Sequence, residues 1–315
     1  MITVLAGGVG AARLLRGLVL AVPASRVTAV VNTADDVVLH GLHVSPDLDT
    51  VTYTLAEAGN PETGWGLAEE TWQAMDALDR FGGLTWFRLG DRDLGTHLYR
   101  TGRLSEGAGL AAVTAEIAQA WGLATTLLPM TEDPVATIVT LDEGERAGDE
   151  VGFQEYFVRL GHSVAVRSVR FAGADVARPG PGVVEALANA DAVIIAPSNP
   201  VVSIGPLLAV PGIADALSAR RADTVAVSPI VAGKALKGPA DRLLRELGHE
   251  ASVVGVARLY RDLAATLVVD RADADLVDAV EAEGVACVVT NTVMSSPEVA
   301  SELSRQILGC VGVAT

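Results

Sequence analysis

Ile2-Thr3-Val4-Leu5-Ala6-Gly7-Gly8-Val9-Gly10-Ala11-Ala12-Arg13-Leu14-Leu15 opens the chain and decides its fold. A short apolar run, a glycine-rich turn and a segment of helical spacing predict strand, turn and helix in that order. Because glycine has no Cβ, a ligand can approach such a turn closely. The helix presents free N–H groups and the positive end of its dipole, so Gly7, Gly8 and Gly10 are candidate phosphate-binding residues. The stretch matches neither the dinucleotide fingerprint nor the P-loop. A turn that needs glycine for geometry alone is an equal alternative.

Composition narrows the class of protein. Of the 315 residues, 50% are hydrophobic and 4% aromatic, and the net charge is −16. Abundant Ala, Val and Leu suit buried parallel strands, so we expect an α/β fold, a Rossmann-like three-layer sandwich with a mainly parallel sheet. The negative charge disfavours nucleic acid and anionic membranes as partners. No membrane-length apolar run, no signal-peptide pattern and only two cysteines predict a cytoplasmic protein.

The elements expected along the chain form one core and one insertion. Core strands are predicted at 27–32, 85–89, 125–130, 191–196, 224–229, 263–269 and 285–290. Helices are predicted at 50–58, 67–78, 110–121, 182–190, 239–247 and 297–308. Between them, a strand at 136–141, a helix that begins near Phe153 and an alternating strand at 163–171 indicate a small α+β unit. We therefore expect a core of residues 1–130 and 176–315, with residues 131–175 as the insertion.

Four carboxylates follow the second predicted strand on one loop. They are Asp35, Asp36, Asp47 and Asp49. Hard oxygen ligands of this kind suit Mg²⁺, above all beside a diphosphate that supplies further oxygens. All four are candidate metal ligands, and Asp36 and Asp49 are the candidate catalytic residues. Helix capping by Asp47 or Asp49 and a solvated turn at Asp35 and Asp36 are the alternatives.

Two later loops also follow predicted strands. The first supplies candidate substrate-binding residues Ser198, Asn199, Pro200 and Ser203; it either reads a base or phosphate, or is a turn made rigid by proline. The second holds Lys234 and Lys237, the only lysines among 23 basic residues. Compact ammonium groups suit a phosphate, although chance clustering is the alternative. In a doubly wound sheet, loops 7–10, 32–50, 197–205 and 229–238 all face one crevice.

The segment around Arg88 is a further candidate. Arg88 lies at the end of the predicted strand 85–89, before a charged loop, and either pairs with Asp91 or Asp93 or binds a substrate anion. Trp65 and Trp72 belong either to the core or to the wall of a pocket for a flat ring.

Taken together, these segments resemble the 2-phospho-L-lactate transferase and phosphoenolpyruvate transferase family of coenzyme F-420 biosynthesis. The matching pieces are Leu-Ala-Gly-Gly-Val-Gly at 5–10, Asn-Thr-Ala-Asp-Asp at 32–36, Ser-Pro-Asp-Leu-Asp-Thr at 45–50, Leu-Gly-Asp-Arg-Asp at 89–93, Pro-Ser-Asn-Pro at 197–200 and Ser-Pro-Ile-Val-Ala-Gly at 228–233.

The resemblance implies a guanosine diphosphate ester of a three-carbon acid as donor and the deazaflavin Fo as acceptor. The terminal ribityl hydroxyl of Fo attacks the phosphorus that bears the acid, and GMP leaves. Within the family, archaeal members look suited to 2-phospholactate and actinobacterial members to phosphoenolpyruvate. The lysine-poor, alanine-rich composition suggests an actinobacterial source, so the resemblance favours phosphoenolpyruvate as the acid. In the family, the positions that match Asp49 and Arg88 contact the deazaflavin. Mg²⁺ is the expected cofactor and a homodimer the expected assembly.

Two other readings remain open at this point. Related proteins with a similar Gly-Gly-x-Gly opening and Asn-x-x-Asp-Asp segment bind a nucleotide sugar and regulate carbon metabolism or cell-wall synthesis without catalysis. Segments 45–50 and 89–93 favour the transferase instead. A dehydrogenase-like nucleotide binder is disfavoured by the missing third glycine and because no acidic residue ends the second strand at the expected distance from the turn.

Overall fold

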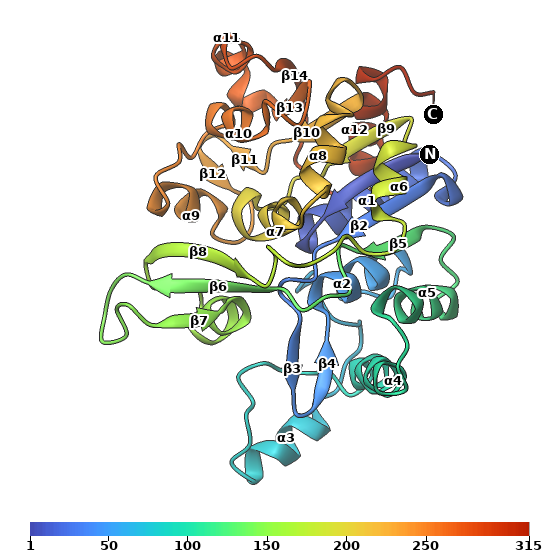
Figure 1. Cartoon of the computed structure of the whole chain (residues 1–315), viewed down its shortest axis with the longest axis vertical. Helices are drawn as coiled ribbons and strands as arrows, with labels where there is room; N and C mark the ends of the chain where they lie inside the picture. Colours follow the sequence, from blue (N-terminus) through green and yellow to red (C-terminus); the bar gives the residue numbers. More distant parts are fainter. Residues whose placement is uncertain (315) are drawn as a thin grey trace.

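The computed structural model describes residues 1–314, which are built around a seven-stranded parallel sheet (Figure 1). The strand order is β14-β13-β10-β9-β1-β2-β5. These strands are β1 (Ile2–Ala6), β2 (Val27–Val31), β5 (Thr126–Pro129), β9 (Ala192–Ile195), β10 (Thr224–Val227), β13 (Thr266–Asp270) and β14 (Ala286–Thr290). When these seven strands alone are numbered in chain order, they follow the Rossmann strand order with one strand added at the end. The predicted α/β fold class is confirmed.

Helices cover both faces of this sheet. On one face lie α1 (Gly8–Ala21), α2 (Pro46–Leu55), α5 (Leu110–Ala120) and α12 (Pro297–Cys310). On the other lie α6 (Val183–Ala188), α7 (Gly205–Ala209), α8 (Ile213–Ser218), α9 (Ala240–Glu246), α10 (Val253–Tyr260) and α11 (Val277–Ala282). β1 illustrates the sequence requirement: Val4 and Ala6 pack on the first face and Leu5 on the second. A strand buried on both faces must be apolar throughout.

A second, antiparallel sheet lies beside the first. It has the order β7-β6-β8, from β6 (Ala136–Leu141), β7 (Glu150–Gly152) and β8 (Val166–Ala172). A π-helical turn at Glu155–Arg159 joins β7 to β8. The core of this small sheet includes Val202 and Leu243, so it packs against α9 and the loop after β9. The division of the chain into a core and an insertion at 131–175 stays a prediction.

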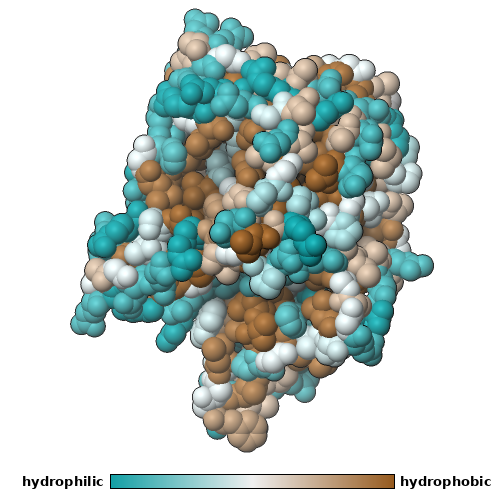
Figure 2. All heavy atoms as spheres, viewed as in Figure 1, coloured by the Kyte–Doolittle hydropathy of each residue, from teal (hydrophilic) through white to brown (hydrophobic). Residues whose placement is uncertain are grey.

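Part of the segment between β2 and β5 forms a separate lobe, whose hairpin and second helix the sequence patterns did not predict (Figure 1). It contains the hairpin of β3 (Val37–Leu39) and β4 (Leu42–Val44), and the helices α3 (Gln73–Arg80) and α4 (Asp93–Ser105). Figure 2 shows apolar side chains on its surface, and Phe81 near the end of α3 is 85% exposed.

Four predicted elements between β2 and β5 need correction. The predicted strand at 85–89 is wrong. Leu89 packs on the hairpin against Leu39 and Val44, so residues 85–89 are apolar and aromatic because they pack at the small core of the lobe. The helix predicted at 50–58 begins at Pro46, and the helix predicted at 67–78 begins at Gln73. The loop predicted at 90–97 already contains the start of α4 at Asp93.

Within residues 1–314, no helix is long and apolar enough to cross a membrane.

Candidate active site

A cavity of about 710 Å³ opens at the carboxyl edge of the parallel sheet. β1 lies between β2 and β9, so the chain turns in opposite directions on either side of it. In open α/β sheets this switch point is where ligands bind. The cavity lining includes Gly7, Gly8, Gly10, Asp35, Asp47, Asp49, Arg88, Ser198, Asn199, Ser203 and Lys237. Of the candidate residues, Asp36, Pro200 and Lys234 lie outside this lining.

The glycine turn is shaped by close packing as well as by its place on the cavity. Gly8 has a positive φ of 70°, a conformation that favours glycine. A Cβ added at Gly10 would overlap the Pro197 carbonyl oxygen. Ser198 Oγ donates a hydrogen bond of 2.7 Å to the Gly7 carbonyl, which holds the loop after β9 against the turn. The geometric need for glycine is therefore present, and the turn also faces the cavity.

Asp35 and Asp47 form a buried pair of carboxylates on the cavity wall. Asn32 Nδ2 donates to Asp35 Oδ2 at 3.1 Å and to Asp47 Oδ2 at 3.0 Å. Asp47 also accepts a hydrogen bond from the Gly8 backbone at the start of α1. Burial, and then the neighbouring charge of Asp47, raise the pKa of Asp35; burial likewise raises the pKa of Asp47. Two adjacent carboxylates in this setting favour a proton or a cation between them.

These carboxylates fit the donor set that Mg²⁺ prefers. Asp35 Oδ1 is buried and has no hydrogen-bond partner. Among residues 1–314, neither Asp35 nor Asp47 forms an ion pair with a basic side chain, and no group of three or more metal-ligating side chains gathers. A metal here would depend on oxygen atoms from a ligand and water, which is the usual coordination of Mg²⁺ in phosphate-binding sites.

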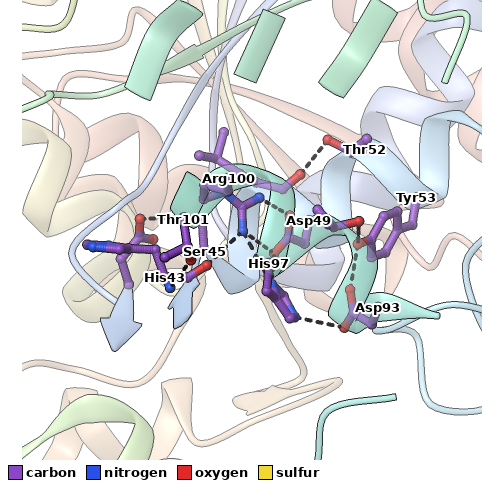
Figure 3. Close-up of polar contacts among 12 residues, drawn as sticks. His43, Ser45, Asp49, Thr52, Tyr53, Asp93, His97, Arg100 and Thr101 are labelled. Atoms are coloured by element: carbon purple, nitrogen blue, oxygen red, sulfur yellow. Dashed lines mark hydrogen bonds and ion pairs between the residues drawn. The ribbon is translucent and has the colours of Figure 1, made fainter. Parts of the chain in front are cut away.

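The other two candidate carboxylates have different surroundings. Asp36 Oδ2 accepts a hydrogen bond of 2.6 Å from Ser45 Oγ, and burial raises the pKa of Asp36. Asp49 faces the cavity, but both of its oxygens are bound by the guanidinium of Arg100 (Figure 3). Asp47 and Asp49 both lie in the first turn of α2 rather than in a loop.

The loop after β9 has a structural role that its composition left open. Asn199 Oδ1 accepts hydrogen bonds from the backbone of Val201 at 2.9 Å and Val202 at 3.4 Å, and so caps the helical turn at Pro200–Ile204. The Asn199 side-chain oxygen is therefore already occupied, whereas Ser203 remains on the cavity wall.

The two lysines lie in different places. Lys234 is exposed in the short hairpin of β11 (Ile230–Val231) and β12 (Lys234–Ala235). Lys237 lines the cavity, and its Nζ lies 3.4 Å from the Thr63 carbonyl on the opposite side of the entrance. A cation is thus available at the entrance.

Aromatic side chains line much of the cavity. Trp65 and Phe87 come from the lobe, and Phe153 and Phe157 come from the segment after β7. Arg88 also lines the cavity; its guanidinium stacks over Trp72 at 4.6 Å and its Nη2 lies 3.4 Å from Asp76 Oδ1. Trp65 therefore belongs to the cavity wall, whereas Trp72 packs in the core of the lobe.

Sequence reasoning missed several cavity residues. The segment from Thr292 to Ser295 follows β14 and lines the cavity. The Thr292 backbone N–H donates a hydrogen bond of 2.9 Å to Asp270 Oδ2 at the end of β13. The strand-end rule that found the other loops would have found this one. No sequence signal marked Tyr53 or His97, which reach the cavity because α4 packs beside α2.

Comparison with known proteins identifies the family. A family model described as "2-phospho-L-lactate transferase CofD" matches residues 2–303. The chain belongs to the CofD family. The resemblance read from the sequence motifs is thus confirmed, and the matched range includes every segment that lines the cavity.

Relatives in the CofD family extend over nearly the whole chain. The phosphoenolpyruvate transferase of Kitasatospora aureofaciens is 46% identical over 312 residues, which cover 98% of this chain and 96% of the relative. That of Streptomyces coelicolor is 45% identical over 310 residues, 98% and 97% of the two chains. A crystal structure of a UPF0052 family protein from Bacillus halodurans matches with a TM-score of 0.63, 20% identity and 98% coverage of both chains. That likeness concerns the fold alone.

Proposed function

We propose that the protein transfers a phosphoenolpyruvyl group from a guanosine diphosphate ester to the deazaflavin Fo and releases GMP. One observation carries the proposal: a single cavity is lined both by groups that suit a phosphate and by aromatic side chains. The glycine turn, Asp35, Asp47 and Lys237 suit a diphosphate, and the aromatic residues suit a flat ring system. Membership of the CofD family and relatives named phosphoenolpyruvate transferase support the same reaction.

The reaction needs positioning and charge neutralisation rather than a covalent nucleophile. The terminal ribityl hydroxyl of Fo forms a bond to the phosphorus that bears the enolpyruvyl group. The bond from that phosphorus to the bridging oxygen breaks, its electron pair leaves with GMP, and the hydroxyl proton is lost. The backbone N–H groups at the start of α1 and the Lys237 ammonium would bind the phosphates and stabilise the leaving group.

Mg²⁺ belongs to this proposal as the expected cofactor. Asp35 and Asp47 would hold it, and when bound it would neutralise charge on the diphosphate. The two carboxylates lie at the start of α1, where the glycine turn would place the diphosphate. Small molecules are the proposed partners, and a homodimer stays a prediction.

The test is an assay of purified protein with Fo, Mg²⁺ and either the enolpyruvyl or the 2-phospholactyl guanosine diphosphate donor. Mass spectrometry should detect the enolpyruvyl product of Fo together with an equal amount of GMP. Omission of Fo and addition of EDTA are the controls, and both should abolish GMP release. A protein that binds the donor but forms no product with either acid would favour the alternative of a non-catalytic, nucleotide-sugar-binding regulator.

A further inference from the structure

Asp49 on the cavity wall forms a buried ion pair with Arg100, and Figure 3 shows the contacts between the two side chains. Asp49 lies in the first turn of α2, and Arg100 lies in the middle of α4. Their side chains are 7% and 2% exposed. Arg100 Nη1 donates to Asp49 Oδ2 at 3.1 Å, and Nη2 donates to Oδ1. Paired donors to both oxygens of a carboxylate fix its orientation as well as its charge.

Arg100 does not itself reach the cavity. Asp49 lines the cavity and Arg100 does not, so the guanidinium holds the carboxylate from behind. Arg100 Nη1 also donates to the His43 carbonyl at 3.3 Å and lies 3.4 Å from His97 Nδ1. The guanidinium is thus fixed by α2, by β4 and by its own helix.

A second set of contacts joins the same two helices one turn further along α2. The Tyr53 hydroxyl lies 2.5 Å from Asp93 Oδ1 and 2.7 Å from Thr96 Oγ1. His97 Nε2 lies 3.3 Å from Asp93 Oδ2. Because Tyr53, Asp93 and His97 all line the cavity, this side of the cavity is held by α4 as a unit.

The ion pair separates Asp49 chemically from the other cavity carboxylates. Asp35 has a buried oxygen with no partner and no basic neighbour in ion-pair contact within residues 1–314. Asp49 has both oxygens occupied by a cation. A neighbouring guanidinium repels a metal ion, whereas its paired N–H donors orient the carboxylate as a hydrogen-bond acceptor. Removal of Arg100 would leave a buried charge without compensation.

We propose that Arg100 is a positioning residue for the acceptor half of the reaction. It fixes the orientation of the Asp49 carboxylate on the cavity wall, and so it acts on Fo only through Asp49. The inference rests on the proposed function: Asp49 is held by α4 of the lobe, and the lobe also supplies Trp65 and Phe87, aromatic cavity residues that suit the flat ring of Fo. The donor, held at the glycine turn and the Asp35–Asp47 pair, should be unaffected.

The experiment measures saturation curves for Fo and for the guanylyl donor in a double-mutant cycle. The variants are Arg100→Lys, Asp49→Asn and the two combined. Arg103→Lys is the matched control, since Arg103 lies on the same helix but pairs at the surface with Glu116, 2.9 Å away. We expect Arg100→Lys and Asp49→Asn each to raise the KM for Fo at least 10-fold with the donor KM within 2-fold of wild type. The combined variant should be no worse than Asp49→Asn alone.

Each other outcome overturns the inference. A wild-type KM for Fo in Arg100→Lys would refute it, and so would a combined variant whose loss is the product of the two single losses. An equal shift in Arg103→Lys would assign the effect to helix stability. Lysine is chosen at position 100 because it retains the positive charge, whereas a larger change could prevent folding. Thermal unfolding of each variant checks that the protein is folded. Wild-type protein that transfers nothing to Fo would refute the proposed function and this inference together, whereas an active wild type with an unchanged Arg100→Lys refutes the inference alone.

Discussion

Asp47→Asn should make the metal-free protein more stable and the enzyme much less active. Burial raises the pKa of Asp47 from the ordinary value of 3.8 to about 6. A carboxyl whose folded pKa is raised destabilises the fold at pH values above its ordinary pKa, and the cost is complete above the folded pKa. At about 1.4 kcal/mol per pKa unit, the cost near neutral pH is about 3 kcal/mol. Asparagine has the same shape without the charge, but it gives up one of the two hydrogen bonds from Asn32 and Gly8, a loss of about 1 kcal/mol. The net gain of about 2 kcal/mol would raise the unfolding temperature by a few degrees.

The assay compares thermal unfolding in EDTA with unfolding in Mg²⁺ plus donor, and turnover under the second condition. Wild type should gain stability from Mg²⁺ and donor, because a ligand stabilises the state that binds it. Asp47→Asn should gain little and should lose about 10²-fold or more in turnover, the scale for loss of a phosphoryl-stabilising group. Asp91→Asn is the control, because it should change stability in the opposite direction. Hydrogen bonds from Thr71 and from the Ala74 and Gln73 backbone lower the pKa of Asp91, so this change should lower the unfolding temperature. Wild-type turnover in Asp47→Asn, or turnover in EDTA equal to that in Mg²⁺, would refute the reasoning.

Two further substitution pairs test other parts of the site. Lys237→Ala should raise the KM for the guanylyl donor about 10-fold or more, the scale for a charged hydrogen bond, whereas Lys234→Ala, outside the cavity, should leave both saturation curves unchanged. Equal donor curves for the two variants would remove Lys237 from the site. Gly10→Ala should destabilise the fold by about 1–3 kcal/mol, because the new methyl group meets the Pro197 carbonyl, whereas Gly102→Ala in α4, with open space around it, should gain about 0.5–1 kcal/mol in chemical denaturation. A Gly10→Ala protein as stable as wild type would contradict the close approach of the two loops.

The sequence was sufficient for the parallel sheet because its signals are local. Each core strand is a short apolar run followed by a polar loop, and the carboxyl ends of parallel strands meet at one edge. The lobe between β2 and β5 lacked such signals. Its hairpin has strands of only three residues. Partly buried aromatic residues at irregular spacing pack against its small aliphatic core, and they imitated a strand at 85–89.

The different surroundings of the carboxylates could not be predicted for a different reason. Asp35, Asp47 and Asp49 are equal members of one acidic stretch in the sequence. What separates Asp49 is a guanidinium 51 positions away, which reaches it only because α4 packs beside α2. Pairing between distant charged residues depends on how helices dock, and neither residue type nor spacing encodes that docking.

The glycine turn shows that a structural and a functional reading of one motif need not compete. The Pro197 carbonyl approaches Gly10 so closely that no side chain fits, and Ser198 donates to the Gly7 carbonyl beside it. These contacts bring the loop after β9 against the start of α1, and that junction is where the chain reverses direction across the sheet. The packing that demands glycine therefore also builds the crevice, because two loops diverge from the point where they touch. A Cβ at Gly10 would disturb the fold and the shape of the cavity at once, which is why the turn could not be assigned from its sequence to one role alone.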